Sequence, residues 1–266
     1  ISDKKVLVEV LKSESPDVAI NCVLPTLNTL IMEACLESKV NYIDTASFWA
    51  EDKDKDAKLP YKFEQLDFHE QFKQAGIIGL FGAGVAPGLD NILAKHASAN
   101  LDRLDDIRIR LIEDTQTEEI LFSWSKEWLL DEINTLPLVY RDGEFKLLEA
   151  FGEPEEYRFP DPFGNKKVFL LAQDEVGSIP LYLKVKNVDL KAYDNQGEAV
   201  VFMYKLKLTS SREIEVKGHK IKPIDFLCRL LPDVPATFTD KKFENAYFVL
   251  VLEADGRKDG SKKTKY

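Results

Sequence analysis

The sequence predicts an α/β protein in two parts, a parallel sheet with crossover helices followed by a mixed or antiparallel α+β domain. Three short apolar runs, at residues 17–24, 40–44 and 77–81, alternate with segments whose apolar residues recur at helical spacing. This alternation is typical of a parallel sheet with right-handed crossovers. After Leu104 the rhythm stops, so we expect one domain over residues 1–104 and a second over residues 105–266.

Each element of the first part has its own sequence signal. The run at 17–24 is almost continuously apolar and ends at Pro25, which predicts a strand buried on both faces. The two later runs predict further strands of the same sheet. Apolar residues at helical spacing predict the helices, at about residues 6–11, 27–35, 63–72 and 89–101.

The second part shows the alternation of antiparallel strands. Ile107, Ile109 and Leu111 alternate with Arg108 and Arg110, which predicts a strand with one face in water. A long strand over residues 246–253 leads into a turn and the start of a second strand. Turns are expected where proline, glycine and aspartate gather, at residues 141–143, 159–162 and 231–235.

Composition narrows the range of functions. The 266 residues are 44% hydrophobic with a net charge of −10, and no basic stripe appears, so we expect no nucleic-acid partner. No apolar run approaches the roughly 20 residues that span a bilayer, so we expect no membrane association. Cys22, Cys35 and Cys228 form no paired motif, which indicates a reduced, cytoplasmic protein. The histidines and cysteines lack ligand spacing, so no metal site is predicted.

Three segments are expected to meet at one edge of the first sheet. Residues 21–25 and 42–45 end two successive strands, and ligands of open parallel sheets bind beyond such ends. Gly82, Gly84 and Gly88 follow the third strand as G-x-G-x-x-x-G, whereas the dinucleotide fingerprint is G-x-G-x-x-G after the first strand. The turn is therefore either a later part of a cofactor pocket or a tight strand-to-helix connection.

These residues carry a family resemblance. The segments Asn-Cys-Val-Leu-Pro at 21–25, Tyr-Ile-Asp-Thr at 42–45, Gly-Ala-Gly-Val-Ala-Pro-Gly at 82–88 and Phe-Ser-Trp-Ser at 122–125 resemble the saccharopine dehydrogenase family, which includes lysine 6-dehydrogenases and carboxynorspermidine synthases. The resemblance implies a Rossmann-like first domain that binds NAD or NADP. It also leads us to expect that the glycine fingerprint precedes Ile1, so that residues 1–266 alone bind dinucleotide weakly.

The resemblance implies roles for individual residues. The residues implied to bind the cofactor are Asn21, Cys22, Pro25, Asp44, Thr45, Ala46, Gly84, Val85, Pro87 and Gly88. Those implied to bind the substrate are Ser123, Trp124 and Ser125. Saccharopine-forming relatives place an arginine shortly afterwards, but here Lys126 and Glu127 follow, so Arg158 is the candidate for a substitute cation, or else a surface residue. Tyr42 and Asp44 are candidates for proton transfer.

We therefore expect an NAD(P)-dependent oxidoreductase that transfers a hydride at a C–N centre of an amino-acid or polyamine-related substrate. A small-molecule substrate and a homodimer are the expected partners. The alternative is a non-catalytic nucleotide-sensing or oligomerisation protein on the same fold, because a fold does not determine function.

Overall fold

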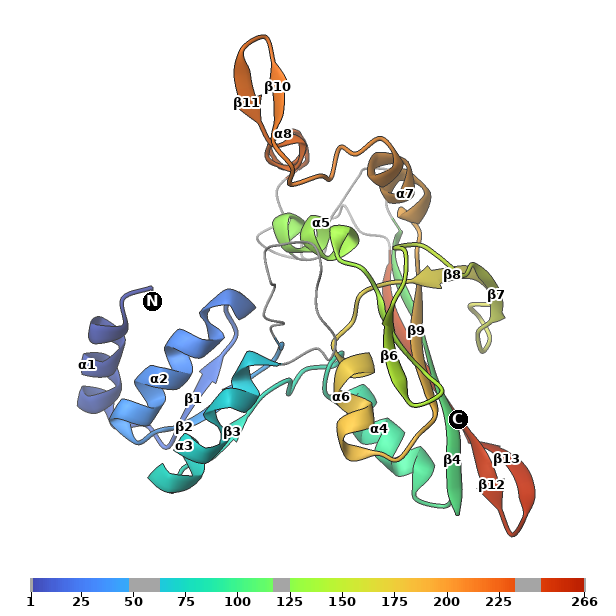
Figure 1. Ribbon diagram of the computed structural model, residues 1–266, viewed down its shortest axis with the longest axis horizontal. Coiled ribbons are helices and arrows are strands. Elements are labelled where there is room, and N and C mark those ends of the chain that lie inside the picture. The colour runs from blue at the N-terminus through green and yellow to red at the C-terminus, as the bar shows by residue number, and fades with distance from the viewer. Residues whose placement is uncertain (1, 48–62, 117–124, 233–244, 266) are drawn as a thin grey trace. The chain divides into compact units, whose positions relative to one another are not determined.

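The structure is a computed structural model that describes residues 2–47, 63–116, 125–232 and 245–265 (Figure 1). The chain divides into two compact units. Unit 1 comprises Ile1–Asn100 with Gln173–Lys184, and unit 2 comprises Leu101–Ala172 with Val185–Tyr266. The short segment 173–184, which the sequence places in the second half of the chain, thus packs with the first hundred residues.

Unit 1 is an α/β unit whose strands and helices alternate as expected. Its elements are α1 (Lys4–Glu14), β1 (Val18–Asn21), η1 (Pro25–Leu27), α2 (Asn28–Ser38), β2 (Asn41–Asp44), η2 (Glu64–Phe68), α3 (His69–Ala75), β3 (Gly79–Leu80), α4 (Leu89–Ser98) and α6 (Glu175–Tyr182). The sheet has the order β1-β2-β3, and both pairings are parallel. The predicted parallel sheet is confirmed.

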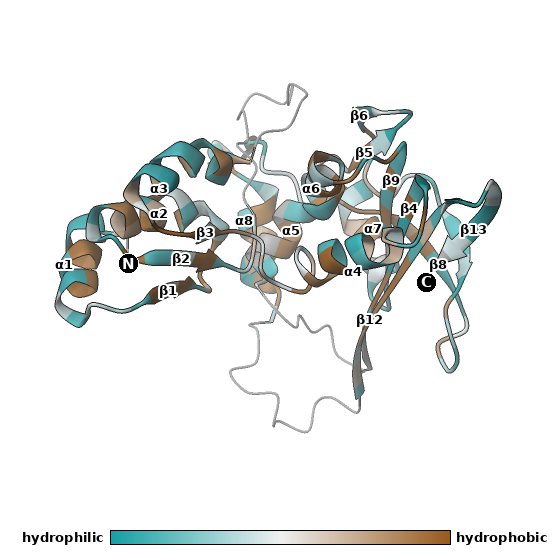
Figure 2. Ribbon diagram, turned by 90° about the horizontal axis from the view of Figure 1, so that it is seen from below, coloured by the Kyte–Doolittle hydropathy of each residue, from teal (hydrophilic) through white to brown (hydrophobic). Residues whose placement is uncertain are grey.

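The core of unit 1 lies between the sheet and one layer of helices. Helices α1, α2 and α3 lie on one side of the three strands (Figure 2). Val8 and Leu11 of α1 pack with Ile31 of α2, Tyr42 of β2 and Phe72 of α3 in one buried cluster. The helix caps fit their sequence, since the Asp3 side chain accepts the first N–H groups of α1 and Gly76 ends α3 with φ 71°.

The other face of this sheet differs from the expectation of strands buried on both sides. Strand residues alternate between faces, so Val18 and Ile20 point away from the side chains that meet the helices. They are 36% and 65% exposed, and Leu80 of β3 is 50% exposed. Among the described residues, the helices α1–α3 cover only the opposite face, which explains the difference.

Unit 2 is built on a mixed sheet of eight strands. Its elements are β4 (Arg103–Gln116), α5 (Lys126–Asn134), β5 (Leu138–Arg141), β6 (Glu144–Leu147), β7 (Glu155–Arg158), β8 (Asn165–Leu170), β9 (Asn187–Asp194), α7 (Gly197–Lys205), β10 (Ile214–Val216), β11 (His219–Ile221), α8 (Pro223–Leu230), β12 (Asn245–Lys258) and β13 (Ser261–Lys265).

The sheet of unit 2 follows the order β13-β12-β4-β9-β5-β6, with the β7–β8 hairpin joined through β8 to β9. Only the β4–β9 pairing is parallel, so the predicted mixed α+β class is confirmed. Gly256 stands at a register shift between β12 and β4. A Cβ there would lie 2.1 Å from the Arg103 carbonyl oxygen, so only glycine fits.

The expectation of a wet face on β4 is wrong at Arg110. This side chain is 1% exposed. Its guanidinium contacts Asp189 at 2.7 Å and Glu155 at 2.9 Å, and it lies over the Tyr157 ring at 5.8 Å. The β7–β8 hairpin supplies Glu155 and Tyr157, so this later segment covers the position. Arg108, whose side chain is 40% exposed, keeps more of the expected contact with water.

No helix in the described part of the chain is both long and apolar enough to cross a membrane.

Candidate functional site

The carboxyl ends of β1 and β2 carry a buried network of polar side chains. Asn21 ends β1 and Asp44 ends β2, and the parallel register places them opposite each other. The Asn21 amide donates to the Tyr42 hydroxyl at 3.0 Å, and that hydroxyl donates to Asp44 Oδ2 at 2.8 Å. Asp44 Oδ1 accepts the Gly82 N–H at 2.6 Å. The network thus ties both strand ends to the start of the glycine turn.

Asn28, at the start of α2, extends this network. Its side-chain oxygen accepts a hydrogen bond from Asn21 at 2.7 Å, and its Nδ2 donates to the Ala46 carbonyl at 2.8 Å. Asn28 is 1% exposed, and its hydrogen bond to Ala46 holds the backbone beyond β2 in place from the interior. It is a site residue that the sequence did not predict, although an asparagine just after Pro25 at a helix start is a signal that could have found it.

Burial sets the proton chemistry of this network. It raises the pKa of the Tyr42 phenol above its usual range, and the neighbouring Asp44 acts in the same direction. Burial also raises the pKa of Asp44, against hydrogen bonds from Gly82 and Tyr42 that lower it. Tyr42 is 0% and Asp44 1% exposed. These two predicted candidates for proton transfer therefore lie beneath the surface, with their polar atoms already engaged.

The backbone N–H groups of the glycine turn donate hydrogen bonds within the protein. Gly82 N donates to the Asp44 side chain, and Ala83 N donates to the Asp44 carbonyl at 2.8 Å. Gly84 N donates to Pro87 O at 2.9 Å, and Gly88 N donates to Asp90 Oδ1 at 2.8 Å. A phosphate-binding loop instead directs its N–H groups at the ligand. This geometry agrees with the spacing, which departs from the dinucleotide fingerprint.

Two of these glycines stand where no side chain fits. A Cβ on Gly84 would lie 2.5 Å from the Thr45 carbonyl oxygen. Gly88 has φ +134°, and a Cβ there would lie 2.3 Å from the Gly84 carbonyl oxygen. The turn therefore folds tightly on itself and against the end of β2. This fixes the position of the residues between the two glycines relative to the edge of the sheet.

Other predicted residues are exposed around this fixed base. Cys22 and Thr45 follow the two strand ends and are exposed, and Val85 is 50% exposed at the tip of the glycine turn. Pro25 and Pro87 are buried, and Ala46 is partly buried. The edge thus offers small and apolar surfaces above a polar layer.

Helix α6 packs against the start of α4, directly after the glycine turn. Asn91 Nδ2 donates to Ser178 Oγ at 2.8 Å. The Ser47 N–H donates to Asp174 Oδ2 at 3.1 Å, which joins the segment before α6 to the chain beyond β2. Asp90 and Glu175 are both fully buried at this contact. The sequence did not predict these residues, because no local pattern marks a pairing across more than eighty positions.

The predicted substrate residues are only partly described. Ser123 and Trp124 lie outside the described residues. Ser125 is partly buried and caps α5 through its carbonyl, which accepts Leu129 N at 2.9 Å. Arg158 is exposed at the end of β7. Helix α5, which follows Ser125, and the β7–β8 hairpin, which carries Arg158, lie apart within unit 2 (Figure 1).

Lys126 stands near the position where relatives carry the clamping arginine. It is 8% exposed, and its Nζ donates to the Leu231 carbonyl at 3.1 Å. The ammonium group is therefore engaged inside unit 2.

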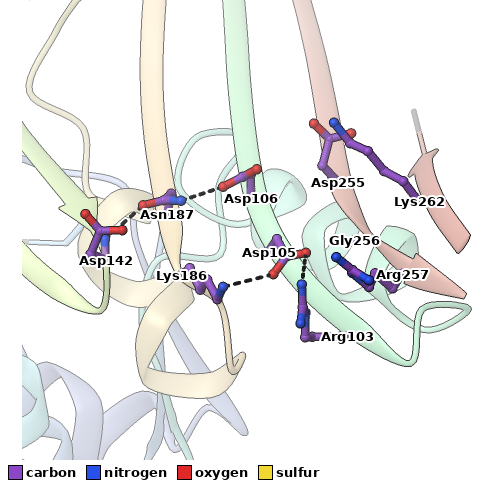
Figure 3. A pocket seen from close by; sticks show the side chains of 10 residues that line it. All are labelled: Arg103, Asp105, Asp106, Asp142, Lys186, Asn187, Asp255, Gly256, Arg257 and Lys262. Carbon is purple, nitrogen blue, oxygen red and sulfur yellow. Dashed lines mark hydrogen bonds and ion pairs between the residues drawn. The ribbon is translucent and has the colours of Figure 1, made fainter. Parts of the chain in front are cut away.

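A hollow of about 340 Å³ lies at one end of the unit 2 sheet (Figure 3). Several of its polar groups contact each other, since Asp105 contacts Arg103 at 2.9 Å and Lys186 at 3.5 Å, and Asn187 donates to Asp106 at 2.5 Å. None of the predicted site residues lines it. The residues around it are Arg103, Asp105, Asp106, Asp142, Lys186, Asn187, Asp255, Gly256, Arg257 and Lys262. We therefore take the edge of unit 1 as the candidate site.

Comparison with known proteins confirms the resemblance. Residues 1–80 match the saccharopine dehydrogenase NADP binding domain family. This match also confirms the predicted class of cofactor, NAD or NADP.

Two relatives match most of the chain. The carboxynorspermidine synthase of Vibrio alginolyticus is 29% identical over 233 residues, which cover 85% of this chain and 56% of that protein. The carboxyaminopropylagmatine dehydrogenase of Synechocystis sp. is 27% identical over 271 residues, which cover 97% of this chain and 64% of that protein. The chain thus spans less than two thirds of the length of either relative.

Two solved structures show the fold. Apo saccharopine dehydrogenase (L-Glu forming) from Saccharomyces cerevisiae aligns with a TM-score of 0.58 and 14% identity, covering 99% of this chain and 72% of that chain. Homospermidine synthase from Legionella pneumophila in complex with NAD aligns with a TM-score of 0.56 and 13% identity, covering 98% and 65%. The predicted Rossmann-like fold is confirmed.

Proposed function

Given this confirmed resemblance to the saccharopine dehydrogenase family, we propose that the chain carries the nicotinamide side of an NAD(P)-dependent oxidoreductase that acts at a C–N centre. The observation that carries the proposal is the edge of unit 1. There, Cys22, Thr45 and Val85 are exposed above side chains that are already hydrogen-bonded to each other. The substrate is an amino compound related to polyamines or amino acids, as the names of the two relatives suggest.

The residues of the edge divide into two roles. Cys22, Thr45 and Val85 contact the nicotinamide and its ribose, because their side chains are exposed at the edge of the sheet where the carboxyl ends of its strands lie. The buried Asn21 and Asp44 hold the strand ends in place, together with Pro25 and Ala46. Gly84, Pro87 and Gly88 fix the position of the glycine turn relative to the edge of the sheet. A rigid base of this kind lowers the ordering cost of binding.

Tyr42 takes a positioning role within this proposal. Its hydroxyl donates to Asp44 and its ring is fully buried, so it does not reach a substrate. The same burial assigns Asp44 to positioning. A proton donor for the substrate nitrogen would come from another part of the protein or from water.

The proposed reaction is the reduction of an imine to an amine. Cys22, Thr45 and Val85 would hold the nicotinamide, which when bound would provide hydride chemistry at an imine carbon, with a proton added to the imine nitrogen to give the amine. The edge contributes orientation and exclusion of water. Ser123, Trp124, Ser125 and Arg158 remain our proposal for the substrate side, and a homodimer in the cytoplasm remains our proposal for the assembly.

The test is turnover by the full-length protein. NADPH or NADH oxidation is followed with carboxyl-bearing carbonyl compounds paired with diamines, guanidino amines or lysine. We expect steady turnover with at least one pair, and a Val85→Asp variant should lose cofactor affinity while Glu9→Gln, an exposed change on α1, should not. Cofactor binding without turnover across the whole panel would instead support the nucleotide-sensing alternative.

A further inference from the structure

Two carboxyl groups meet in the interior of unit 1, directly behind the glycine turn. Asp90 belongs to the first turn of α4 and Glu175 to the first turn of α6. Both side chains are 0% exposed. Two like charges in so dry a place would repel each other strongly and lose their hydration, so one of them has to be neutral.

The hydrogen bonds show where a proton is needed. Asp90 Oδ1 accepts the N–H groups of Gly88 at 2.8 Å and Asn91 at 2.7 Å. Among the described residues, no N–H or O–H group of another residue donates to Asp90 Oδ2 or to either oxygen of Glu175, and only the backbone N–H of Glu175 itself acts on its carboxyl group. Yet the two carboxyl groups interact with each other across the contact between α4 and α6. As carboxylates both only accept, so their contact becomes a hydrogen bond once one of them carries a proton.

The surroundings assign that proton to Glu175. Burial raises the pKa of Glu175 well above its usual range, and the carboxyl groups of Asp90 and Asp174 act in the same direction. Burial also raises the pKa of Asp90, but the N–H groups of Gly88 and Asn91 stabilise its charged form and oppose the shift. Glu175 is thus the neutral acid that donates, and Asp90 is the carboxylate that accepts.

We propose that Glu175 is a positioning residue for the cofactor site. Its protonated carboxyl group donates a hydrogen bond to Asp90 and thereby holds the glycine turn in place. That bond orients the Asp90 carboxylate so that its other oxygen fixes the N–H of Gly88. Gly88 in turn closes the loop that presents Val85. The Asn91–Ser178 hydrogen bond docks the same two helices beside it.

A consequence is a coupling between pH and cofactor binding. When Glu175 loses its proton, two buried negative charges face each other across the contact between α4 and α6. The contact then weakens, and the turn loses its support. This inference rests on the proposed function only for the cofactor, since the support of the turn is a property of unit 1 itself.

The test compares two substitutions in the full-length protein. Glu175→Gln keeps a donor toward Asp90 without a titrating proton, whereas Glu175→Ala removes the donor, and Glu9→Gln serves as an exposed control. Two quantities are measured from about pH 5 to about pH 9. One is the hydrogen-exchange protection of the Gly88 and Asn91 amides, and the other is the dissociation constant for NADPH.

We expect Glu175→Ala to lose protection at Gly88 and Asn91 and to bind NADPH about tenfold more weakly, which corresponds to the loss of one buried hydrogen bond. The wild-type protein should lose protection and affinity as pH rises, while Glu175→Gln stays near the wild-type values at low pH throughout.

Unchanged amide protection in Glu175→Ala, or a pH dependence that persists in Glu175→Gln, would overturn the inference. If even the wild-type protein fails to bind NADPH, the proposed function fails, and the amide protection alone still decides whether Glu175 supports the turn.

Discussion

Buried charge is handled in opposite ways by the two units. In unit 1, Asp90 and Glu175 are two acids in contact, and burial raises the pKa of both. In unit 2, Asp189 is equally hidden, but its oxygens contact Arg110 at 2.7 Å and Arg141 at 2.8 Å. Burial alone would raise the pKa of Asp189, but the two guanidinium groups hold it below its usual value.

The difference teaches that the neighbour decides what a buried carboxyl does. A cation keeps the carboxylate charged and fixed, which suits a part of the sheet that only has to be stable. A second acid forces a shared proton, which is lost as pH rises. The pair of acids lies next to the candidate cofactor edge, whereas the ion-paired cluster around Arg110 lies in the sheet of unit 2.

The largest effect is expected from breaking the paired cluster. Arg110→Ala would leave Asp189 and Glu155 without their shared guanidinium, although Arg141 and Lys191 still contact them. Removing one partner of a buried ion pair costs roughly 3–5 kcal/mol, and we expect about 3 kcal/mol here. Hydrogen exchange of the β4 and β9 amides measures this loss locally.

Arg108→Ala is the matched comparison on the same strand. Its side chain is 40% exposed, although its partners Glu253 and Asp255 are 12% and 6% exposed, so its removal should cost less than the removal of Arg110. Equal losses for the two variants would show that the burial of Arg110 has no energetic meaning, and the contrast between the units would collapse.

A smaller effect is expected from pH. The raised pKa of Glu175 means that the folded unit 1 binds more protons than the unfolded chain. Its stability is therefore complete below the ordinary glutamate value of 4.5 and falls as pH rises, by up to about 1.4 kcal/mol per pH unit. The lowered pKa of Asp189 has the opposite sign, so its contribution is present above 3.8 and is lost as pH falls.

The comparison is cleanest above about pH 7, roughly one unit above the pKa of the other shifted carboxyl group. Burial raises the pKa of Asp194 in unit 2 to about 6, so that group is largely ionised there. As pH rises above about 7, the amides of α4 should lose protection while those of β4 stay constant. Glu175→Gln should remove the part of the unit 1 slope that Glu175 carries. Parallel slopes in both units would contradict this reading.

Local patterns in the sequence were sufficient to predict much of the fold and the meeting of the three candidate segments at one edge of the first sheet. The apolar runs at 17–24 and 40–44 predicted β1 and β2, because period and length distinguish strands from helices within a few residues. The unusual spacing of Gly82, Gly84 and Gly88 separated this turn from a phosphate loop, and its internal hydrogen bonds agree. Both features are encoded by residues close together in the chain.

Contacts between distant segments could not be predicted in this way. Arg110 seemed to be exposed because alternation along one strand does not show that the later β7–β8 hairpin covers it. Glu175 lies 85 positions beyond Asp90, in a segment whose packing with unit 1 no local pattern indicates. The burial of these charged residues can be predicted only when the distant segment that covers them is known.

The most direct test of the cofactor site is a map of NADPH binding on the full-length protein by backbone amide shifts. We predict that the largest shifts occur at Cys22, Thr45 and Val85 in unit 1, followed by the supporting amide of Gly88. The amides of Asp106 and Asn187 at the unit 2 hollow should not move. Shifts confined to that hollow, or no shifts at saturating NADPH, would contradict the assignment of the cofactor to the edge of unit 1.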